Sequence, residues 1–141
     1  MAVKRVTPEE ARVLLQDKGY AYIDVRSVPE FEAGHPEGAY NIPLTHLGPS
    51  GMTPNLDFLS VVKKTFPMDS KLVVGCKSGG RSLQAATILL SSGYVDVIDQ
   101  RAGFGGGLDA TGRPEPGWSA KGLPTATEAE AGRSYEELKK R

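Results

Sequence analysis

The sequence predicts an α/β fold around a mainly parallel sheet, and three observations support this prediction. Short apolar runs typical of strands alternate with segments in which apolar residues recur at helical spacing. Such alternation is typical of βαβ units, whose strands lie parallel. The chain has 141 residues, the usual size of one domain, and 39% hydrophobic residues, which suffice for a packed core.

The predicted elements follow one another in a regular order. A helix begins after Thr7, whose hydroxyl can cap the first amides while Glu10 completes a capping box, and Gly19 ends it. The other predicted segments are, in chain order, an edge strand at 3–6, a strand at 20–25, one or two helical turns at 28–33, a short strand at 39–42, a loop at 45–53, a helix from Thr53-Pro54 to about 66, a strand at 71–75, a helix at 81–90, a strand at 95–98 and a glycine-rich loop at 101–117.

Composition and charge exclude several classes of function. Lysine plus arginine equals aspartate plus glutamate at 17 each, so the chain has no global electrostatic footprint for nucleic acid. Its first residues lack the apolar segment of a secretory signal, and no apolar run approaches the roughly 20 residues that span a bilayer. We expect a cytoplasmic protein that binds neither nucleic acid nor a membrane.

The chain has one cysteine, Cys76, and two histidines, His35 and His46. A single thiol cannot form an internal disulfide, which fits a reducing compartment. A lone cysteine with two distant histidines makes a poor ligand set for a metal. We therefore expect neither a metal nor an organic cofactor.

The most informative stretch is LVVGCKSGGRSLQAATILL, residues 72–90. Cys76 stands between a predicted strand and a predicted helix, and the glycine-containing turn between them can point successive amides inward. The first turn of the helix adds unpaired amides and partial positive charge, which favours the thiolate, the nucleophilic form of cysteine. The pattern predicts a nucleophilic Cys76 in an anion cradle formed by Lys77, Ser78, Gly79, Gly80, Arg81 and Ser82.

Simpler interpretations of these residues stay open. Cys76 can be an inert thiol at a strand end, and Arg81 a surface charge on the helix. Lys77 can be solvated, and the serines at 78 and 82 can act only as helix caps. The combination of strand, cysteine, two glycines, arginine and helix favours the nucleophile.

Four segments together resemble the rhodanese family of single-domain sulfurtransferases. YIDVRSVPEFEAGHPEGAYNIP (22–43) is similar to the first signature of the family, and CKSGGRS (76–82) is similar to its active-site loop. GYVDVIDQRAGF (93–104) and WSAKGLP (118–124) resemble the strand with its glycine turn and the closing motif. The resemblance covers residues 1–124, and these motifs in this order are highly specific.

The resemblance implies a fold and a reaction. The rhodanese-like fold has a five-stranded, mainly parallel sheet flanked by helices on both faces. Cys76 would take the outer sulfur of thiosulfate as a persulfide and pass it to cyanide, a thiol or a protein acceptor. Arg81 and Lys77 would bind the anionic donor, which favours thiosulfate over mercaptopyruvate, and amides of residues 77–82 would cradle the transferred sulfur.

Polar residues outside the loop receive more modest predicted roles. Asp24 and Arg26 match the first signature and are expected to support the loop as a charge pair. His35 is expected to stabilise its turn, and no role is assigned to His46. The glutamates at 30 and 32 are expected to form a solvated helix face.

Two rival functions remain at this point. Phosphatases of the same fold resemble this chain but have five residues between cysteine and arginine, whereas four separate Cys76 from Arg81. The shorter loop should hold one sulfur and exclude a phosphoryl group. The second rival is a sulfur-relay or binding module with low turnover of its own.

The chain departs from the family pattern after Gly103. The resemblance implies one rhodanese domain over 1–124, with a loop insertion at about 104–116. Because the insertion follows the carboxyl end of a strand, we expect Phe104, Asp109 or Arg113 to screen the persulfide or to select the acceptor. The charged tail at 125–141 is expected to be helical or disordered.

Overall fold

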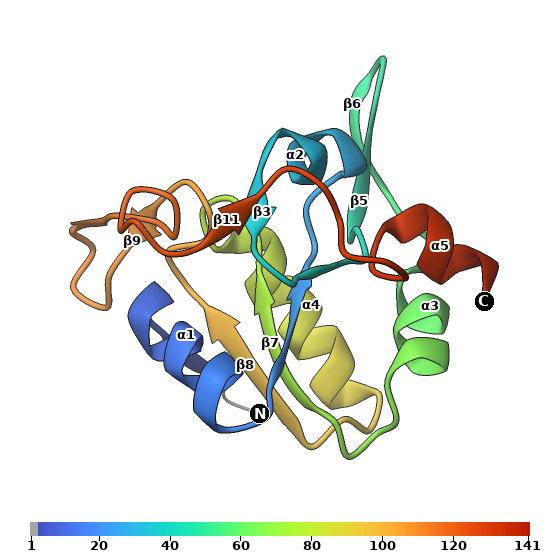
Figure 1. Ribbon diagram of the computed structural model, residues 1–141, viewed down its shortest axis with the longest axis horizontal. Coiled ribbons are helices and arrows are strands. Elements are labelled where there is room, and N and C mark those ends of the chain that lie inside the picture. The colour runs from blue at the N-terminus through green and yellow to red at the C-terminus, as the bar shows by residue number, and fades with distance from the viewer. Residues whose placement is uncertain (1–2) are drawn as a thin grey trace.

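A five-stranded parallel sheet forms the centre of the molecule in a computed structural model that describes residues 3–141 (Figure 1). The strand order is β1-β8-β7-β2-β4, and every neighbouring pair is parallel. The strands are β1 (Lys4–Val6), β8 (Asp96–Gln100), β7 (Lys71–Gly75), β2 (Ala21–Asp24) and β4 (Tyr40–Asn41). The predicted α/β class and five-stranded sheet are confirmed.

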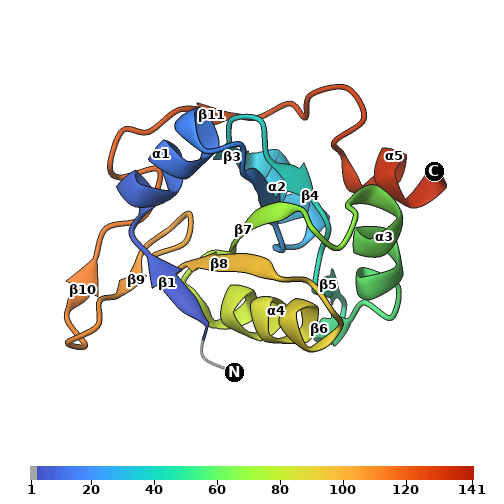
Figure 2. The same ribbon diagram turned by 90° about the horizontal axis from the view of Figure 1, so that it is seen from below.

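Helices cover both faces of this sheet (Figure 2). One face packs against α1 (Pro8–Asp17) and α2 (Val28–Ala33), and the other against α3 (Phe58–Thr65) and α4 (Gly80–Ser91). Strand β7 serves both cores, because Leu72 and Val74 face the α3–α4 side while Val73 faces the α1–α2 side. None of the helices between residues 3 and 141 is long and apolar enough to cross a membrane.

The predicted capping box of α1 is present. Thr7 Oγ1 accepts from the Glu10 amide at 3.1 Å, and Glu10 Oε1 accepts from the Thr7 amide at 2.9 Å. The two bonds satisfy donors that the start of a helix leaves unpaired. Helix α1 therefore begins where the sequence predicts.

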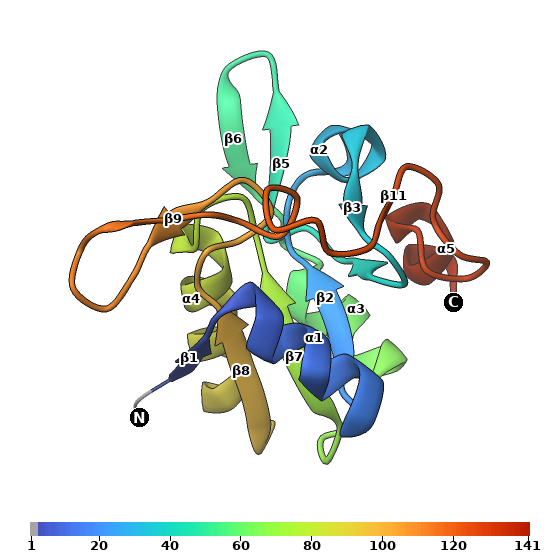
Figure 3. The ribbon, with the colours of Figure 1, turned by 60° about the vertical axis from the view of Figure 1, so that its left-hand side comes forward.

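Two predictions between residues 45 and 66 were wrong. The expected loop is a hairpin of β5 (Thr45–Gly48) and β6 (Gly51–Pro54), which projects from the sheet in Figure 3. The helix begins at Phe58, not at Thr53-Pro54. Asn55 is the reason, because its amide donates to the Leu44 carbonyl at 2.9 Å and its side chain donates to the Pro43 carbonyl at 2.8 Å. These bonds hold the chain in a turn before the helix can start.

The glycine-rich segment at 101–117, expected to lack regular structure, contains a second small hairpin. It consists of β9 (Gly107–Leu108) and β10 (Pro114–Glu115), which pair antiparallel. Asp109 closes the turn between them, because its carboxylate accepts from the Thr111 amide at 2.8 Å and from the Arg113 amide at 3.0 Å. Such local bonds from aspartate to nearby amides stabilise tight turns.

The segment at 125–141 packs onto the domain. Strand β11 (Thr125–Ala126) pairs antiparallel with β3 (His35–Pro36), and helix α5 (Tyr135–Lys140) lies beside α3. Ser134 caps α5 by accepting from the Glu137 amide at 3.2 Å. Leu138 is fully buried in the core on the α3–α4 side.

The burial of Leu138 predicts a stability effect in the tail. Leu138→Ala should lower the free energy of unfolding by about 2–5 kcal/mol, because it removes buried contacts and leaves a cavity. Leu56→Ala is the matched control, since Leu56 is 93% exposed, and it should change stability by less than about 0.5 kcal/mol. Urea denaturation measures both. Equal effects of the two substitutions would contradict the docking of α5.

Candidate functional site

Cys76 follows β7 directly, at the carboxyl edge of the sheet, and begins the turn into α4. The residue is 2% exposed, and its sulfur lies on the inside of the turn. The Gly79 amide donates to Sγ at 3.0 Å, and the Ser82 hydroxyl lies 3.4 Å from Sγ. The Gly79 amide therefore stabilises negative charge on the sulfur, while Ser82 Oγ accepts from the thiol and donates to the Gly79 carbonyl.

Gly79 allows this turn for two physical reasons. Its φ of 101° lies in the left-handed region that side chains disfavour. A Cβ at this position would lie 2.3 Å from the Arg101 carbonyl oxygen, closer than any side chain tolerates. Any residue other than glycine at position 79 would therefore move the loop that carries the amide bonded to Sγ.

Arg81 does not extend freely into solvent, because it forms a two-point ion pair with Glu30 of α2. The distances are 2.7 Å from Nη1 to Oε1 and 3.0 Å from Nη2 to Oε2. The hydrogen bonds from Arg81 lower the pKa of Glu30 to about 2, and the pair raises the pKa of Arg81. The prediction that Glu30 belongs to a solvated face was wrong for this residue, whereas Glu32 is exposed.

Lys77, Ser78 and Gly80 form the exposed side of the same turn. Lys77 has no ion-pair partner among residues 3–141, while Arg81 is paired. The aliphatic part of Lys77 passes beside Gly105, where a Cβ would lie 3.3 Å from Cγ. Lys77 is therefore the uncompensated cation of the Cys76 turn.

Asp24 and Arg26 form a buried pair beneath the neighbouring strand end. Nη2 of Arg26 lies 2.7 Å from Oδ2 of Asp24 and donates to the Gly34 carbonyl at 2.6 Å. The guanidinium also lies 4.5 Å from the centre of the Phe104 ring, an arrangement that favours a cation. These contacts fit the expected supporting role.

His35 stabilises the chain after α2, as the sequence indicates. Its Nδ1 lies 2.8 Å from the Phe31 carbonyl oxygen, and its ring stacks on the Phe31 ring with centroids 3.6 Å apart. The residue is 1% exposed. Neither ring nitrogen is placed as a base for Cys76 by any contact among residues 3–141.

The glycine segment after β8 braces the back of the Cys76 turn. The Phe104 amide donates to the Cys76 carbonyl at 2.7 Å, and the Gly105 amide donates to the Lys77 carbonyl at 2.9 Å. A Cβ at Gly103 would lie 2.5 Å from the carbonyl oxygens of Cys76 and Lys77, so the two backbones pack without side chains between them. The insertion thus borders the site through its backbone.

Of the three residues expected to screen the persulfide, none is among the hydrogen-bond partners of Sγ within residues 3–141. Phe104 covers Arg26, while Asp109 and Arg113 form the turn of the β9–β10 hairpin. The insertion therefore borders the Cys76 turn through residues 104–107. The turn of its hairpin, at 109–113, is not among the hydrogen-bond partners of the sulfur.

An ion pair beneath the turn, between the exposed Arg5 and the buried Asp99, was missed by sequence reasoning. Arg5 Nε lies 2.7 Å from Oδ2 of Asp99, and Arg5 Nη2 donates to the Gly79 carbonyl at 3.5 Å. Asp99 is fully buried, and this burial raises the pKa of its carboxyl group, while Ser82 and Arg5 oppose the effect. Opposite charges on two predicted strands were the available signal, but the sequence did not show that β1 and β8 are neighbours.

Metal binding has no obvious place in this arrangement. Over residues 3–141, no three His, Cys, Asp or Glu side chains gather closely enough to share an ion.

Comparison with known proteins assigns this site to a family. The Rhodanese-like domain model matches residues 7–108, and the chain therefore belongs to the rhodanese family. The chain is 41% identical over 107 residues to thiosulfate sulfurtransferase 16, chloroplastic, of Arabidopsis thaliana, covering 76% of this chain and 80% of that protein. It is 31% identical to the thiosulfate sulfurtransferase GlpE of Pseudomonas fluorescens (strain SBW25), covering 72% and 81%. These relatives support sulfurtransferase function.

Other relatives are longer than this chain. The match to senescence-associated protein DIN1 of Raphanus sativus is 43% identical but spans only 51% of that protein.

Among solved structures, Rv0390 from M. tuberculosis superposes with a TM-score of 0.74 at 27% identity, covering 91% of this chain and all of that one. The rhodanese-like fold predicted from the motifs is confirmed.

The ion pair of Arg81 with Glu30 predicts a pH-dependent contribution to stability. Because the pKa of Glu30 falls from 4.5 to about 2 on folding, its contribution is full above pH 4.5 and is lost as pH falls toward 2. Glu30→Gln should reduce the free energy of unfolding by about 1 kcal/mol at neutral pH, and this difference should shrink below pH 4.5.

Urea denaturation of both proteins at a series of pH values measures this difference. Glu32→Gln on the same helix is the matched control, because Glu32 has no ion-pair partner among the described residues. A Glu30→Gln effect that stays constant down to pH 2 would show that the pair does not stabilise the fold through charge.

Proposed function

We propose that the protein transfers sulfane sulfur from thiosulfate, or a similar anionic donor, to a thiophilic acceptor through a persulfide on Cys76. The single supporting observation is the position of Sγ, which accepts from the Gly79 amide inside a turn that carries Lys77 and Arg81. The names of the relatives support the donor, since two of them are thiosulfate sulfurtransferases.

The proposed reaction has two covalent steps. The Cys76 thiolate attacks the outer sulfur of thiosulfate, a new S–S bond forms, and sulfite leaves with the electron pair of the broken bond. The acceptor, either cyanide or a thiolate, then attacks the outer sulfur of the persulfide. Thiocyanate or an acceptor persulfide leaves, and the Cys76 thiolate returns.

The residues of the turn take distinct roles in this proposal. The Gly79 amide stabilises the Cys76 thiolate before the first step and as it returns in the second, since a donor fixed in place stabilises charge without reorganisation. Lys77 attracts the dianionic donor. Arg81, oriented by Glu30, lies at the start of α4 and stabilises the departing sulfite with its remaining N–H groups and with the helix amides.

This proposal includes three further points. The reaction uses neither a metal nor an organic cofactor, the protein is cytoplasmic, and the acceptor is cyanide or a protein. The burial of Cys76 bears on the acceptor. Because Cys76 is 2% exposed, a small nucleophile or a narrow thiol reaches its sulfur more readily than a folded protein surface does. We therefore favour a small thiol or cyanide as the acceptor in assays.

The persulfide itself is the first prediction of this proposal. Incubation with thiosulfate, followed by desalting without reductant, should add one sulfur atom to the intact mass, and cyanide should remove it. Cys76→Ser should gain nothing under the same treatment. An unchanged mass despite a titratable thiol would contradict thiosulfate as donor, whereas hydrolysis of p-nitrophenyl phosphate by Cys76 would favour the phosphatase alternative.

The exposed charge of Lys77 predicts that the rate of the reaction with thiosulfate depends on salt concentration. Lys77→Gln should lower kcat/KM for thiosulfate roughly fivefold at low ionic strength, since one unit charge about 4 Å from another contributes about 1 kcal/mol in water. The effect should fade at high salt because exposed charges are screened. Lys71→Gln, also exposed and in the strand before the turn, is the control. A loss independent of salt would contradict electrostatic attraction by Lys77.

A further inference from the structure

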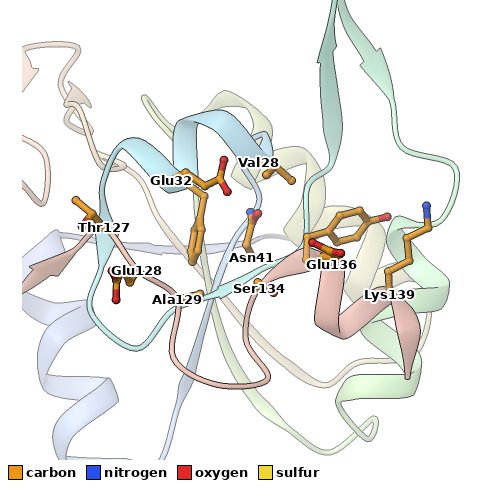
Figure 4. A pocket seen from close by; sticks show the side chains of 11 residues that line it. Val28, Glu32, Asn41, Thr127, Glu128, Ala129, Ser134, Glu136 and Lys139 are labelled. Carbon is orange, nitrogen blue, oxygen red and sulfur yellow. The ribbon is translucent and has the colours of Figure 1, made fainter.

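A pocket of about 610 Å³ opens between α2 and the C-terminal segment, outside the Cys76 turn. Figure 4 shows Asn41 at its centre, with Val28 and Glu32 of α2 above and Ser134 below. Phe31, Ala129 and Tyr135 give the pocket an apolar wall. Its size and mixed lining are typical of sites for small organic molecules.

Asn41 lines this pocket, and its side-chain oxygen is a buried acceptor without a hydrogen-bond partner. The residue is 1% exposed, and its Nδ2 donates to the carbonyls of Asp24 at 3.1 Å and Arg26 at 3.0 Å. These two bonds fix the orientation of the amide, so that its oxygen cannot exchange places with the nitrogen. Oδ1 has no hydrogen-bond partner, and leaving such a buried group unsatisfied costs about 1–3 kcal/mol. Because Oδ1 exposes almost no surface, a ligand that donates an N–H to it has to open a path to this atom, and the bond would then remove this cost.

The charges around the pocket favour a cation. Glu32 and Glu128 are exposed lining residues without an ion-pair partner among residues 3–141. Glu136 also lines the pocket, and its ion pair is with Lys140. Lys139 is the one cation in the lining. Three carboxylates against one ammonium give the pocket a negative potential.

We propose that this pocket binds a small organic amine with an apolar body about the size of one ring. The ammonium group donates to Asn41 Oδ1 and is attracted by Glu32 and Glu128. The apolar body packs against Phe31 and Tyr135, whose rings offer favourable faces to a hydrocarbon or an aromatic group. The site uses none of the residues of the Cys76 turn, so its occupation does not depend on the proposed sulfur transfer.

The direct test is a titration of the full chain with 2-phenylethylamine, followed by NMR of the backbone amides. Saturable shifts should be confined to the residues around the pocket, including Asn41 and Ala129. The matched probe 3-phenylpropionate, of similar size but negative, should shift these amides much less. Equal shifts with both probes, or no saturation at millimolar concentrations, would overturn the proposal.

Substitutions distinguish binding in the pocket from general attraction of the amine to an acidic surface. The double substitution Glu32→Gln with Glu128→Gln should raise Kd for 2-phenylethylamine at least roughly fivefold at low salt, since both carboxylates attract the ammonium group. Glu37→Gln, which removes an exposed charge outside the pocket, should leave Kd unchanged. The opposite pattern would place the amine elsewhere.

A larger side chain in the wall of the pocket tests whether the amine binds inside it. Ala129→Leu adds apolar volume to the wall and should abolish the shifts at Asn41 while leaving persulfide formation on Cys76 intact. Asn41→Leu removes the acceptor, and if it fails to fold, Ala129→Leu alone decides. Undiminished binding in Ala129→Leu would overturn the proposal, whereas a failure of persulfide formation in the unaltered chain would bear only on the proposed function.

Discussion

The contact between two backbones, the Cys76 turn and the glycine segment at 103–107, is the constraint on which the site depends. The turn can place the Gly79 amide on Sγ only in a left-handed conformation, and it can pack on the Arg101 carbonyl only without a side chain. The amides of Phe104 and Gly105 then bond to the carbonyls of the turn. A loop fixed from behind in this way holds its donors in place before any substrate arrives, which is the condition for electrostatic stabilisation of charge.

Ion pairs compensate three of the cations around this turn. Arg5 pairs with Asp99, Arg26 with Asp24 and Arg81 with Glu30, and the first two pairs include a fully or nearly buried carboxylate. Removing one partner of a buried pair leaves an uncompensated charge, typically at a cost of about 3–5 kcal/mol. Lys77 has no ion-pair partner among residues 3–141 and is exposed. The turn therefore keeps one uncompensated cation, Lys77, although the net charge of the chain is zero.

Helix α2 joins the two sites. Its Glu30 faces the Cys76 turn through Arg81, while Phe31 and Glu32 line the pocket that the C-terminal segment closes. Asn41 adds a second connection, because its amide holds the carbonyls of the residues that form the Asp24–Arg26 pair. The C-terminal segment, with Tyr135 and Leu138 buried, is thus part of both the core and the second site.

The sequence by itself determined the elements whose signals are local. Strand-like apolar runs that alternate with helical segments predicted the parallel sheet, and the Thr7–Glu10 box predicted the start of α1. The order of strand, cysteine, glycines and arginine predicted a turn that directs an amide at Cys76. The tertiary structure alone decided the features that join distant residues. Glu30 meets Arg81, Asp99 meets Arg5, and Asn55 delays α3 by bonding to residues 43–44. Neither periodicity nor propensity carries information about such partners, since each depends on which strands and helices become neighbours after folding.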